Sequence, residues 1–312
     1  MSGSTDGRPA KARAAVLCTG IAVQDIVMRV ETFPRPGMKM SATDLVTIGG
    51  GCAANAAVAV ARLGGRSRFA GPLGGPGDPA SREILRGLAR ETVDTHGVRR
   101  VRGARASVSL IMIDAGGEKM IATRRGGGLD AIRPTDPAKL LRGIDIVLAD
   151  NRFPNFVLPL CRAARARGIP VVIDFDKAGP LDAPLLATGT YVIASSEALR
   201  GSTRAKSLRD ALRRLGAAVN GAVAVTDGPN GVLWLDGKTI RQMPAFKVKA
   251  VDTLGAGDAF HGAFALAIAE GRVFADALRF ACATAALKCA TFGGMAGAPG
   301  RAQVMKLLAA KG

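Results

Sequence analysis

Histidine, aromatic residues and long apolar runs are all scarce in this chain of 312 residues. Only two histidines occur, His96 and His261, so a histidine-based catalytic triad or a histidine-rich metal site has little material. We interpret His261 as a packing residue. Uncharged apolar residues never continue for the eighteen positions that a membrane-spanning helix needs, so we expect no membrane partner.

The cysteines do not form a pattern that binds zinc or builds a disulfide framework. There are five of them, an odd number, and none belongs to a Cys-x-x-Cys pair. Such scattered thiols are typical of a reducing compartment, so we expect a cytoplasmic protein. The positions are Cys18, Cys52, Cys161, Cys282 and Cys289.

Lysine and arginine outnumber aspartate and glutamate by 43 to 25. The resulting formal net charge of +18 suggests a nucleic-acid-binding protein as one alternative. The arginines gather at residues 99–105 and 124–125, but no aromatic side chains alternate with them. The chain has one tyrosine and one tryptophan, whereas single-strand binders need aromatic platforms on which bases stack. We therefore favour a basic surface that attracts anionic substrates, and we expect no nucleic-acid partner.

The order of apolar segments predicts an α/β fold. Short β-rich runs alternate with Ala- and Leu-rich helical runs, which favours a mainly parallel sheet covered by helices on both faces. Residues 1–14 read as a flexible basic tail and residues 15–312 as a single domain. Expected strands are Val16–Val23, Ser67–Ala70, Ile144–Ala149, Pro170–Phe175, Tyr191–Ala194 and Ala222–Thr226. Expected helices are Ala53–Leu63, Arg82–Arg90, Val157–Arg167, Ser207–Leu215 and Ala259–Glu270.

Two segments interrupt this alternation, because strand-like residues follow one another there without a helix. They are residues 25–48 and 107–125, and the second has a hairpin signal at residues 115–117. Together they predict a small separate sheet, which serves as a lid over a site or as a dimer surface. Its exposed edges need a cover, so we expect a homodimer that forms through the lid.

The most informative stretch runs from Val251 to Phe260. Gly255, Ala256 and Gly257 stand at the entrance of an apolar helix, where small residues let backbone N–H groups converge on an anion. Asp258 follows them, at a place where it could take a proton from a nucleophile. The arrangement indicates phosphoryl transfer to a hydroxyl group. The plainer alternative is that Asp258 only caps its helix.

Three further constellations are weaker when each is taken alone. Gly49–Gly51 precede a helix that carries Asn55 in its first turn, which suits either a ligand or an ordinary strand–helix turn. Asp25 stands directly after the expected first strand, where it either accepts hydrogen bonds from sugar hydroxyls or is a solvated turn residue. Thr226, Gly228 and Gly231 mark a turn with room for a nucleotide, although most such turns only close a hairpin.

Taken together and in the order in which they occur along the chain, the four constellations resemble the ribokinase-like carbohydrate kinases, also called the PfkB family. Asp252–Phe260 is similar to the family's C-terminal signature, and Gly50-Gly51 with Asn55 is similar to its N-terminal glycine motif. The resemblance extends from about Ala15 to Pro299. It implies a ribokinase-like three-layer sandwich with a mainly parallel central sheet and a small β-sheet lid.

The same resemblance implies a role for each group and the cofactors ATP, Mg²⁺ and a monovalent cation such as K⁺. Asp258 would be the general base, and Gly255, Ala256 and Gly257 would stabilise the developing charge. The sugar would be held by Asp25, Gly50, Gly51 and Asn55. The ATP site would be lined by Ser195, Thr226, Gly228 and Gly231. Asp252 and the loop of residues 290–296 would bind the monovalent cation.

One motif departs from the family pattern. Many members carry an Asn-x-x-Glu sequence that organises Mg²⁺ and the phosphates, whereas the corresponding residues here are Ser195-Ser196-Glu197-Ala198. Either Glu197 takes the place of the missing carboxylate, or ATP and water hold most of the Mg²⁺.

Within the family, the chain resembles members that phosphorylate 6-deoxy-6-sulfofructose. Lys39 and Arg152 match two basic positions that hold the sulfonate, while Thr123 replaces an asparagine and Asn151 is new. Alternatively, Lys39 is solvated and Arg152 pairs with its neighbour Asp150. The resemblance implies a kinase that moves the γ-phosphate of ATP to a sugar hydroxyl, such as the C1 hydroxyl of this sulfosugar or of a related ketose. The remaining alternatives are a ribokinase-, fructokinase- or nucleoside-kinase-type enzyme and a non-catalytic sugar- or nucleic-acid-binding protein.

Overall fold

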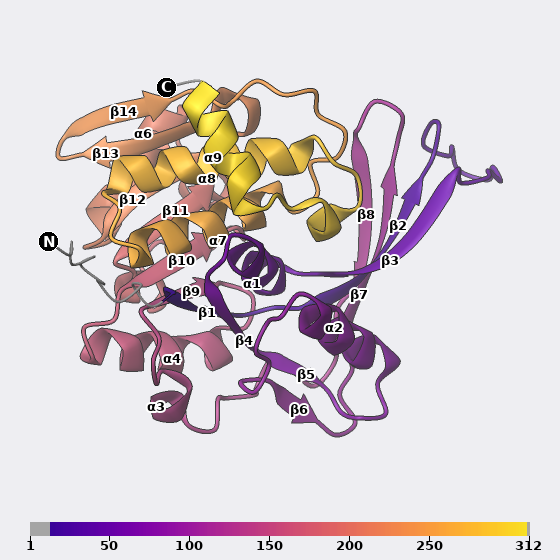
Figure 1. The fold of residues 1–312 in the computed structure, drawn as a ribbon, viewed down its shortest axis with the longest axis horizontal. Coiled ribbons are helices and arrows are strands. Elements are labelled where there is room, and N and C mark those ends of the chain that lie inside the picture. Colours follow the sequence, from indigo (N-terminus) through magenta and orange to yellow (C-terminus); the bar gives the residue numbers. More distant parts are fainter. Residues whose placement is uncertain (1–12, 311–312) are drawn as a thin grey trace, which may run out of the picture.

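A large, mostly parallel sheet forms the centre of the computed structural model, which describes residues 13–310 (Figure 1). Eight strands form it in the order β14-β13-β12-β11-β10-β9-β1-β4, and only β13 and β14 run antiparallel to their neighbours. The predicted basic tail lies outside the described residues except for Arg13 and Ala14. The bounds are β1 Ala15–Thr19, β4 Arg66–Ala70, β9 Ile146–Asp150, β10 Val171–Phe175, β11 Tyr191–Ser195, β12 Ala222–Thr226, β13 Val232–Asp236 and β14 Thr239–Met243.

Helices cover both faces of this sheet, because its inner strands are buried along their whole length and must pack on both sides. One core packs under α1, α2, α7, α8 and α9, and a second packs under α3, α4, α5 and α6. The predicted three-layer sandwich is therefore confirmed. The bounds are α1 Cys52–Arg62, α2 Pro79–Arg90, α3 Pro137–Leu140, α4 Pro154–Ala166, α5 Ser196–Thr203, α6 Leu208–Ala218, α7 Ala256–Ala269, α8 Phe274–Cys289 and α9 Arg301–Ala310.

None of the helices within residues 13–310 is long and apolar enough to cross a membrane. All five cysteines lie in the same range and are free thiols.

The predicted second sheet is also present and stands apart from the main layer in Figure 1. Four strands form it in the order β3-β2-β7-β8, and β7 and β8 make the expected hairpin. A small core of Val27, Ile111 and Ile113 faces Leu254 and Phe292 of the main body. The bounds are β2 Val23–Arg29, β3 Asp44–Gly50, β7 Ser107–Ile113 and β8 Lys119–Arg124. A further pair of short strands, β5 Pro72–Gly74 and β6 Arg99–Val101, was not predicted.

The expected first strand, Val16–Val23, was wrong at its carboxyl end. β1 stops at Thr19, and the chain leaves the large sheet at Gly20, whose φ is +148°. A Cβ atom at Gly20 would lie 2.1 Å from the carboxylate of Asp150, so only glycine fits this close approach. The chain then enters the lid as β2, and Asp25 is therefore a strand residue of the lid and not a turn residue after β1.

Candidate active site

The glycine-led entrances of two helices meet near the carboxyl ends of the parallel strands, the edge at which α/β proteins collect ligands. α1 begins after Gly51, whose φ is +94°. A Cβ atom added at Gly51 would lie only 2.8 Å from the Cα atom of Ala22, so this position requires glycine. α7 begins after Gly255, which is also left-handed at φ 78°. The side-chain amide of Asn55 donates to Oδ2 of Asp258 at 2.7 Å, so the two helix entrances are joined.

The entrance of α7 offers free backbone donors. Its first intrahelical hydrogen bond runs from Ala259 N to Gly255 O at 2.9 Å. The N–H groups of Gly257 and Asp258 precede that bond, so the helix itself provides no acceptor for them. Gly257 is exposed, and a Cβ atom added to it would meet nothing within 4 Å. This end of the helix can therefore receive an anion such as a phosphate group.

The pKa of Asp258 is raised to about 7. Burial is the largest cause, and the negative charges of Asp176, Asp150 and Asp25 add to it, while the hydrogen bond from Asn55 lowers the pKa. A carboxylate with this pKa carries its charge in about half of the molecules at neutral pH, which suits a group that accepts a proton during turnover.

The lid contributes Asp25, which is 5% exposed and has a pKa raised to about 6, mainly by burial. A Cβ atom at Gly50 would lie 1.9 Å from the carboxylate of Asp25, so a glycine at position 50 leaves the space that this side chain fills. The two residues come from adjacent strands, β2 and β3. The structure thus brings Asp25 and Gly50 together, as the sequence analysis expected for a sugar site.

A polar row crosses the lid beside Asp25. Asp25 pairs with Ser109 in the strand register, and Ser109 pairs with Thr123. Ser109 hydrogen-bonds to Asp25, and its hydroxyl lies 3.1 Å from the hydroxyl of Thr123. Thr123 is exposed, so this row of polar side chains ends in a hydroxyl group that solvent or a ligand can reach.

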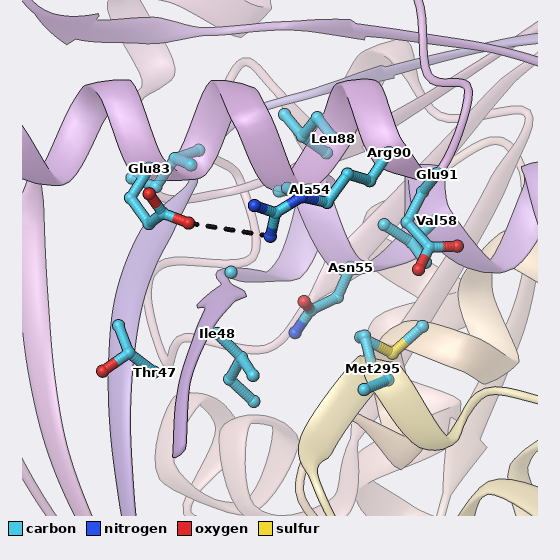
Figure 2. A pocket seen from close by; sticks show the side chains of 14 residues that line it. Thr47, Ile48, Ala54, Asn55, Val58, Glu83, Leu88, Arg90, Glu91 and Met295 are labelled. Atoms are coloured by element: carbon cyan, nitrogen blue, oxygen red, sulfur yellow. Dashed lines mark ion pairs between the residues drawn. The ribbon is translucent and has the colours of Figure 1, made fainter.

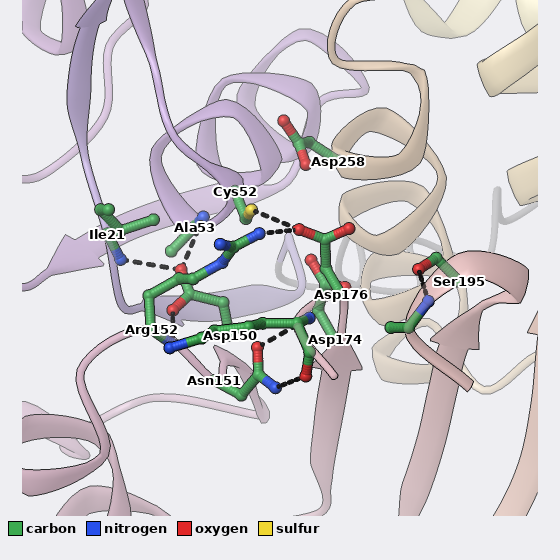
Figure 3. A network of polar contacts seen from close by, with 12 residues as sticks. Ile21, Cys52, Ala53, Asp150, Asn151, Arg152, Asp174, Asp176, Ser195 and Asp258 are labelled. Carbon is green, nitrogen blue, oxygen red and sulfur yellow. Dashed lines mark hydrogen bonds and ion pairs between the residues drawn. The ribbon is translucent and has the colours of Figure 1, made fainter. Parts of the chain in front are cut away.

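Asp150 organises the backbone around the site (Figure 3). Its carboxylate accepts hydrogen bonds from the N–H groups of Ile21 at 2.7 Å, Ala53 at 3.2 Å and Arg152 at 2.9 Å. The guanidinium group of Arg152 points elsewhere and forms an ion pair with Asp176. Nε of Arg152 is buried and has no hydrogen-bond partner among the described residues. The expected alternative, a pair between Arg152 and Asp150, is therefore wrong for the side chain, because Arg152 contacts Asp150 through its backbone N–H.

Asn151 and Lys39 were also expected to bind the sugar, but the first is engaged in a hydrogen-bonded link between two loops and the second lies in the lid. The side-chain amide of Asn151 donates to the carbonyl oxygen of Lys177 at 2.6 Å and accepts from the N–H of Lys177 at 3.2 Å (Figure 3). It therefore joins the loops that follow β9 and β10. Lys39 is exposed in the loop between β2 and β3, and that loop lies at the end of the lid away from the main body (Figure 1). The structure does not bring Lys39 and Arg152 together.

The residues expected around ATP lie at the ends of neighbouring strands. Ser195 ends β11 and pairs with Thr226, which ends β12. Gly228 and Gly231 are both left-handed, at φ 51° and 93°, and bound the turn into β13. A Cβ atom at Gly231 would lie 2.0 Å from the carbonyl oxygen of Met243, so this turn requires glycine.

Sequence reasoning missed three groups beside Asp258, namely Cys52, Asp174 and Asp176. One ligand atom from each of Cys52, Asp174 and Asp258 lies within 4.8 Å of the others. Oδ1 of Asp174 is buried without a hydrogen-bond partner among the described residues, and burial raises the pKa of this carboxyl well above its usual range. The signal was present, because Asp174 and Asp176 close a buried strand at its carboxyl end, as Asp150 does.

Mg²⁺ would find suitable ligands in only part of this cluster. Carboxylate oxygens such as those of Asp174 and Asp258 are the donors that Mg²⁺ prefers, whereas the thiol of Cys52 is not. Burial is the largest cause of the high pKa of Cys52, so this side chain stays a neutral thiol.

The motif that departs from the family pattern lies at the start of α5. Ser195 caps this helix by accepting a hydrogen bond from Ala198 N at 3.2 Å, and the side chain of Glu197 is exposed beside it.

His261 packs one turn beyond Asp258 on α7. It is 3% exposed, and its Nδ1 lies 2.8 Å from the carbonyl oxygen of Gly257. Burial is the largest cause that lowers the pKa of His261, which keeps the imidazole neutral. The ring therefore supports the first turn of α7, in agreement with a packing residue.

Asp252 is buried beneath the entrance of α7. Its Oδ1 accepts from the N–H of Leu254 at 2.8 Å. Its Oδ2 accepts from Nζ of Lys288 at 2.9 Å and from the N–H groups of Gly293 at 3.1 Å and Gly294 at 2.9 Å. Both carboxylate oxygens are thus engaged by N–H donors.

A cavity of about 180 Å³ lies on the other side of Asn55 (Figure 2). It is enclosed by residues of β3, α1, α2 and the turn near Met295. An ion pair between Glu83 and Arg90 borders it. Neither Asp25 nor Asp258 lines this cavity, so it is separate from the place where the carboxylates converge.

The covered parallel sheet, the lid and the glycine-led helix define an α/β phosphotransferase that acts on an alcohol group. The family model described as pfkB family carbohydrate kinase matches residues 13–301. Because this match spans far more than half of the chain, the chain belongs to the pfkB family of carbohydrate kinases. The predicted family and enzyme class are confirmed.

Individual relatives agree with this assignment. The ribokinase of Bacillus subtilis is 29% identical over 293 residues, which cover 93% of this chain and 97% of the relative. A crystal structure from Agrobacterium tumefaciens that bears the name ribokinase superposes with a TM-score of 0.91 at 36% identity, and the match covers 96% and 99% of the two chains. The ribokinase of Arabidopsis thaliana, solved with ribose and ATP, gives 0.82 at 28% identity and covers 96% and 99%.

Proposed function

We propose that this chain phosphorylates a sugar hydroxyl with ATP and that Asp258 is the general base. The observation that carries the proposal is the meeting of three groups at one place. The carboxylate of Asp258 is held by Asn55 at 2.7 Å, it stands in the first turn of α7 beside free N–H groups, and Asp25 of the lid is near enough to raise its pKa. A proton acceptor (Asp258), a binding place for an anion (the N–H groups of α7) and a carboxylate that can bind hydroxyl groups (Asp25) are thus close together.

The reaction follows from these positions. The sugar hydroxyl gives its proton to the carboxylate of Asp258 while its oxygen attacks the γ-phosphorus of ATP. The bond between the γ-phosphorus and the bridging oxygen breaks, and ADP leaves. The N–H groups of Gly255, Gly257 and Asp258 stabilise the negative charge on the transferred group, which is the main source of rate in phosphoryl transfer. The N–H of Ala256, which was also expected to do so, already donates to the carbonyl oxygen of Thr253 at 3.3 Å.

The other groups bind and orient the reactants. Asp25, Gly50, Gly51 and Asn55 hold the sugar, and Ser195, Thr226, Gly228 and Gly231 line the ATP site. Mg²⁺ that arrives with ATP would neutralise phosphate charge. Asp174, whose buried Oδ1 accepts no hydrogen bond from the described residues and lies 3.5 Å from Nε2 of His261, is a carboxylate that could orient it.

An activity screen tests the broad proposal. Purified protein with Mg-ATP is incubated with a panel of ketoses, aldoses, nucleosides and sugar phosphates, and ADP release is measured. We expect rapid ADP release with at least one sugar. No turnover with any member of the panel would contradict the proposal, and turnover with nucleosides alone would replace it by a nucleoside kinase.

The narrower proposal is that the acceptor is a fructose with an anionic group at C6, such as 6-deoxy-6-sulfofructose, phosphorylated at C1. The supporting observation is Arg152, whose buried Nε lacks a partner and can donate to an anion. Asp176 opposes this role because it already neutralises the guanidinium group. Lys39 would have to approach with the lid loop, and Thr123 would complete the pocket from β8.

Two matched substrates decide this point. Arg152→Met and Lys39→Met should each raise KM for the anionic sugar at least tenfold more than KM for fructose. Equal effects on both sugars would remove the argument for an anionic group, while leaving the sugar-kinase proposal intact.

A further inference from the structure

A buried ion pair lies under the entrance of α7, where Lys288 meets Asp252. The side chain of Lys288 is 0% exposed, and that of Asp252 is 1% exposed. Nζ of Lys288 donates to Oδ2 of Asp252 at 2.9 Å and to the backbone carbonyl oxygen of Asp252 at 2.8 Å. Lysine is almost never buried so completely unless it is paired, so this contact requires an explanation.

The pair connects three segments that meet beneath the entrance of α7. Lys288 stands near the carboxyl end of α8, and Asp252 precedes α7. Oδ2 of Asp252 also accepts from the consecutive N–H groups of Gly293 and Gly294, both left-handed at φ 101° and 56°. Consecutive N–H groups in such a turn form a concave site for an anion, which is here the carboxylate itself.

Asp252 transmits this anchoring to the catalytic loop. Its Oδ1 accepts from the N–H of Leu254, and Leu254 directly precedes Gly255, which begins α7. The direction of the N–H groups at the entrance of α7 therefore depends on where the carboxylate is held. A positive charge beside Asp252 fixes this carboxylate without closing the anion site above it.

The residues around Asp252 do not fit the monovalent cation that the resemblance implies. A K⁺ ion would need the carboxylate and carbonyl oxygens of Asp252, and Nζ of Lys288 already contacts both. The remaining contacts of the carboxylate come from N–H groups, which repel a cation. Two unit charges of the same sign about 4 Å apart repel each other strongly where water is excluded.

We propose that the ammonium group of Lys288 is a built-in substitute for a monovalent cation, so that the chain is active without K⁺. Lys288 is a positioning residue, because it acts on the reaction through Asp252 and Leu254. The inference rests on the proposed function for its effect on turnover. Its effect on cation binding can be measured independently.

The wild-type protein provides the first test. Turnover and thermal unfolding are measured in a tetramethylammonium buffer and then with K⁺, Na⁺ or Li⁺ at constant ionic strength. We expect kcat to change less than twofold and Tm to be the same for all three ions. A tenfold or greater activation by K⁺ would overturn the proposal, as would a rise in Tm that K⁺ produces and Li⁺ does not.

Two substitutions at position 288 provide the second test. Lys288→Ala removes the charge and leaves room for an ion, and Lys288→Met removes the charge but fills the space with an apolar chain. We expect both variants to lose at least tenfold in kcat without added cation. K⁺ should restore part of the activity and raise the Tm of the Ala variant only, with K⁺ more effective than Li⁺.

The matched control is Lys306→Ala, an exposed lysine on α9, which should behave like wild type. Full activity of Lys288→Ala in the absence of cations would show that the ammonium group has no positioning role. If the Ala variant does not fold, the wild-type titration still decides. If no sugar is phosphorylated at all, the proposed function fails, while the Tm measurements still test whether Lys288 occupies the cation site.

Discussion

The side-chain amide of Asn55 donates to the carboxylate of Asp258 at 2.7 Å, across 203 positions of sequence. This contact joins the first turn of α1 to the first turn of α7. It is also the contact that lowers the pKa of Asp258 against the combined effects of burial and neighbouring carboxylates. Asn55 therefore links the glycine motif on the sugar side to the proposed base.

Removal of this amide should move the pH profile of turnover. In Asn55→Ala the hydrogen bond that favours the charged form of Asp258 is lost, so the pKa of Asp258 should rise above about 7. One hydrogen bond to a charged group corresponds to about 1 pH unit. We expect the rising limb of kcat to shift to higher pH by about that amount, measured between pH 5 and 9.

Val58→Ala is the control for this shift. Val58 lies one turn further along α1 and borders the cavity behind Asn55, and its alkyl side chain has no group that could donate a hydrogen bond to Asp258. Its profile should keep the wild-type midpoint. An unshifted profile in Asn55→Ala would mean that another group sets the rising limb.

Asp258→Asn should abolish most turnover while ATP still binds. Loss of a general base costs about 10²- to 10⁴-fold in rate. We expect this loss in kcat and a Kd for ATP within a fewfold of wild type, measured by calorimetry. Normal turnover would place the base elsewhere.

The same variant should be more stable than wild type. The folded-state pKa of Asp258 is raised to about 7 from 3.8, so its ionisation disfavours the fold increasingly as pH rises between those values. An asparagine carries no such cost. We expect Tm of Asp258→Asn to exceed that of wild type by a few degrees at pH 8 and by much less at pH 4. A gain that is the same at both pH values would contradict the electrostatic cause.

Gly50 and Gly49 form a matched pair for the sugar site. Gly50→Ala places a Cβ atom at 1.9 Å from the carboxylate of Asp25 and must displace it, whereas Gly49→Ala meets nothing within 4 Å. We expect KM for the sugar to rise at least tenfold in Gly50→Ala and to stay near wild type in Gly49→Ala. Equal KM values for the two variants would exclude Asp25 from sugar binding.

The outer face of the lid should mediate homodimer formation. Leu45, Leu110 and Met120 are large apolar side chains of the lid that are 55%, 40% and 47% exposed. They lie on the face opposite to Val27 and Ile111, which pack towards the main body. Sedimentation equilibrium should give a dimer, and Leu110→Lys should shift it towards the monomer. A wild-type monomer at micromolar concentration would contradict the homodimer proposal.

The layers of the fold could be predicted because each depends on local patterns. Alternating β-rich and helical runs indicated the covered sheet, and the hairpin at residues 115–117 indicated the lid. The end of β1 could not be predicted in the same way. Its place depends on Gly20, which is needed only because Asp150 approaches from a distant strand.

The candidate site could be proposed from the sequence where glycines and carboxylates share a short motif, as they do around Gly255 and Asp258. Asp174 was missed because a carboxylate inside an apolar strand gives no local sign of what it faces. Lys288 was missed as a functional group because a lysine near the end of a helix is ordinarily solvated. Its burial depends on Asp252, which is 36 positions away and on another segment.

The division of the site between two sheets has a consequence for how its affinity is read. Asp25 belongs to the lid, whereas Asn55 and Asp258 belong to the main body, so under the proposed function the sugar would be held by both parts together. Any motion of the lid away from the main body would then lower the measured association constant to the intrinsic one multiplied by the fraction of molecules in which the lid is in place. Gly51, with a φ of +94°, stands where the chain passes from β3 of the lid into α1, so a substitution there would change that fraction through the backbone as well as the proposed contact with the sugar.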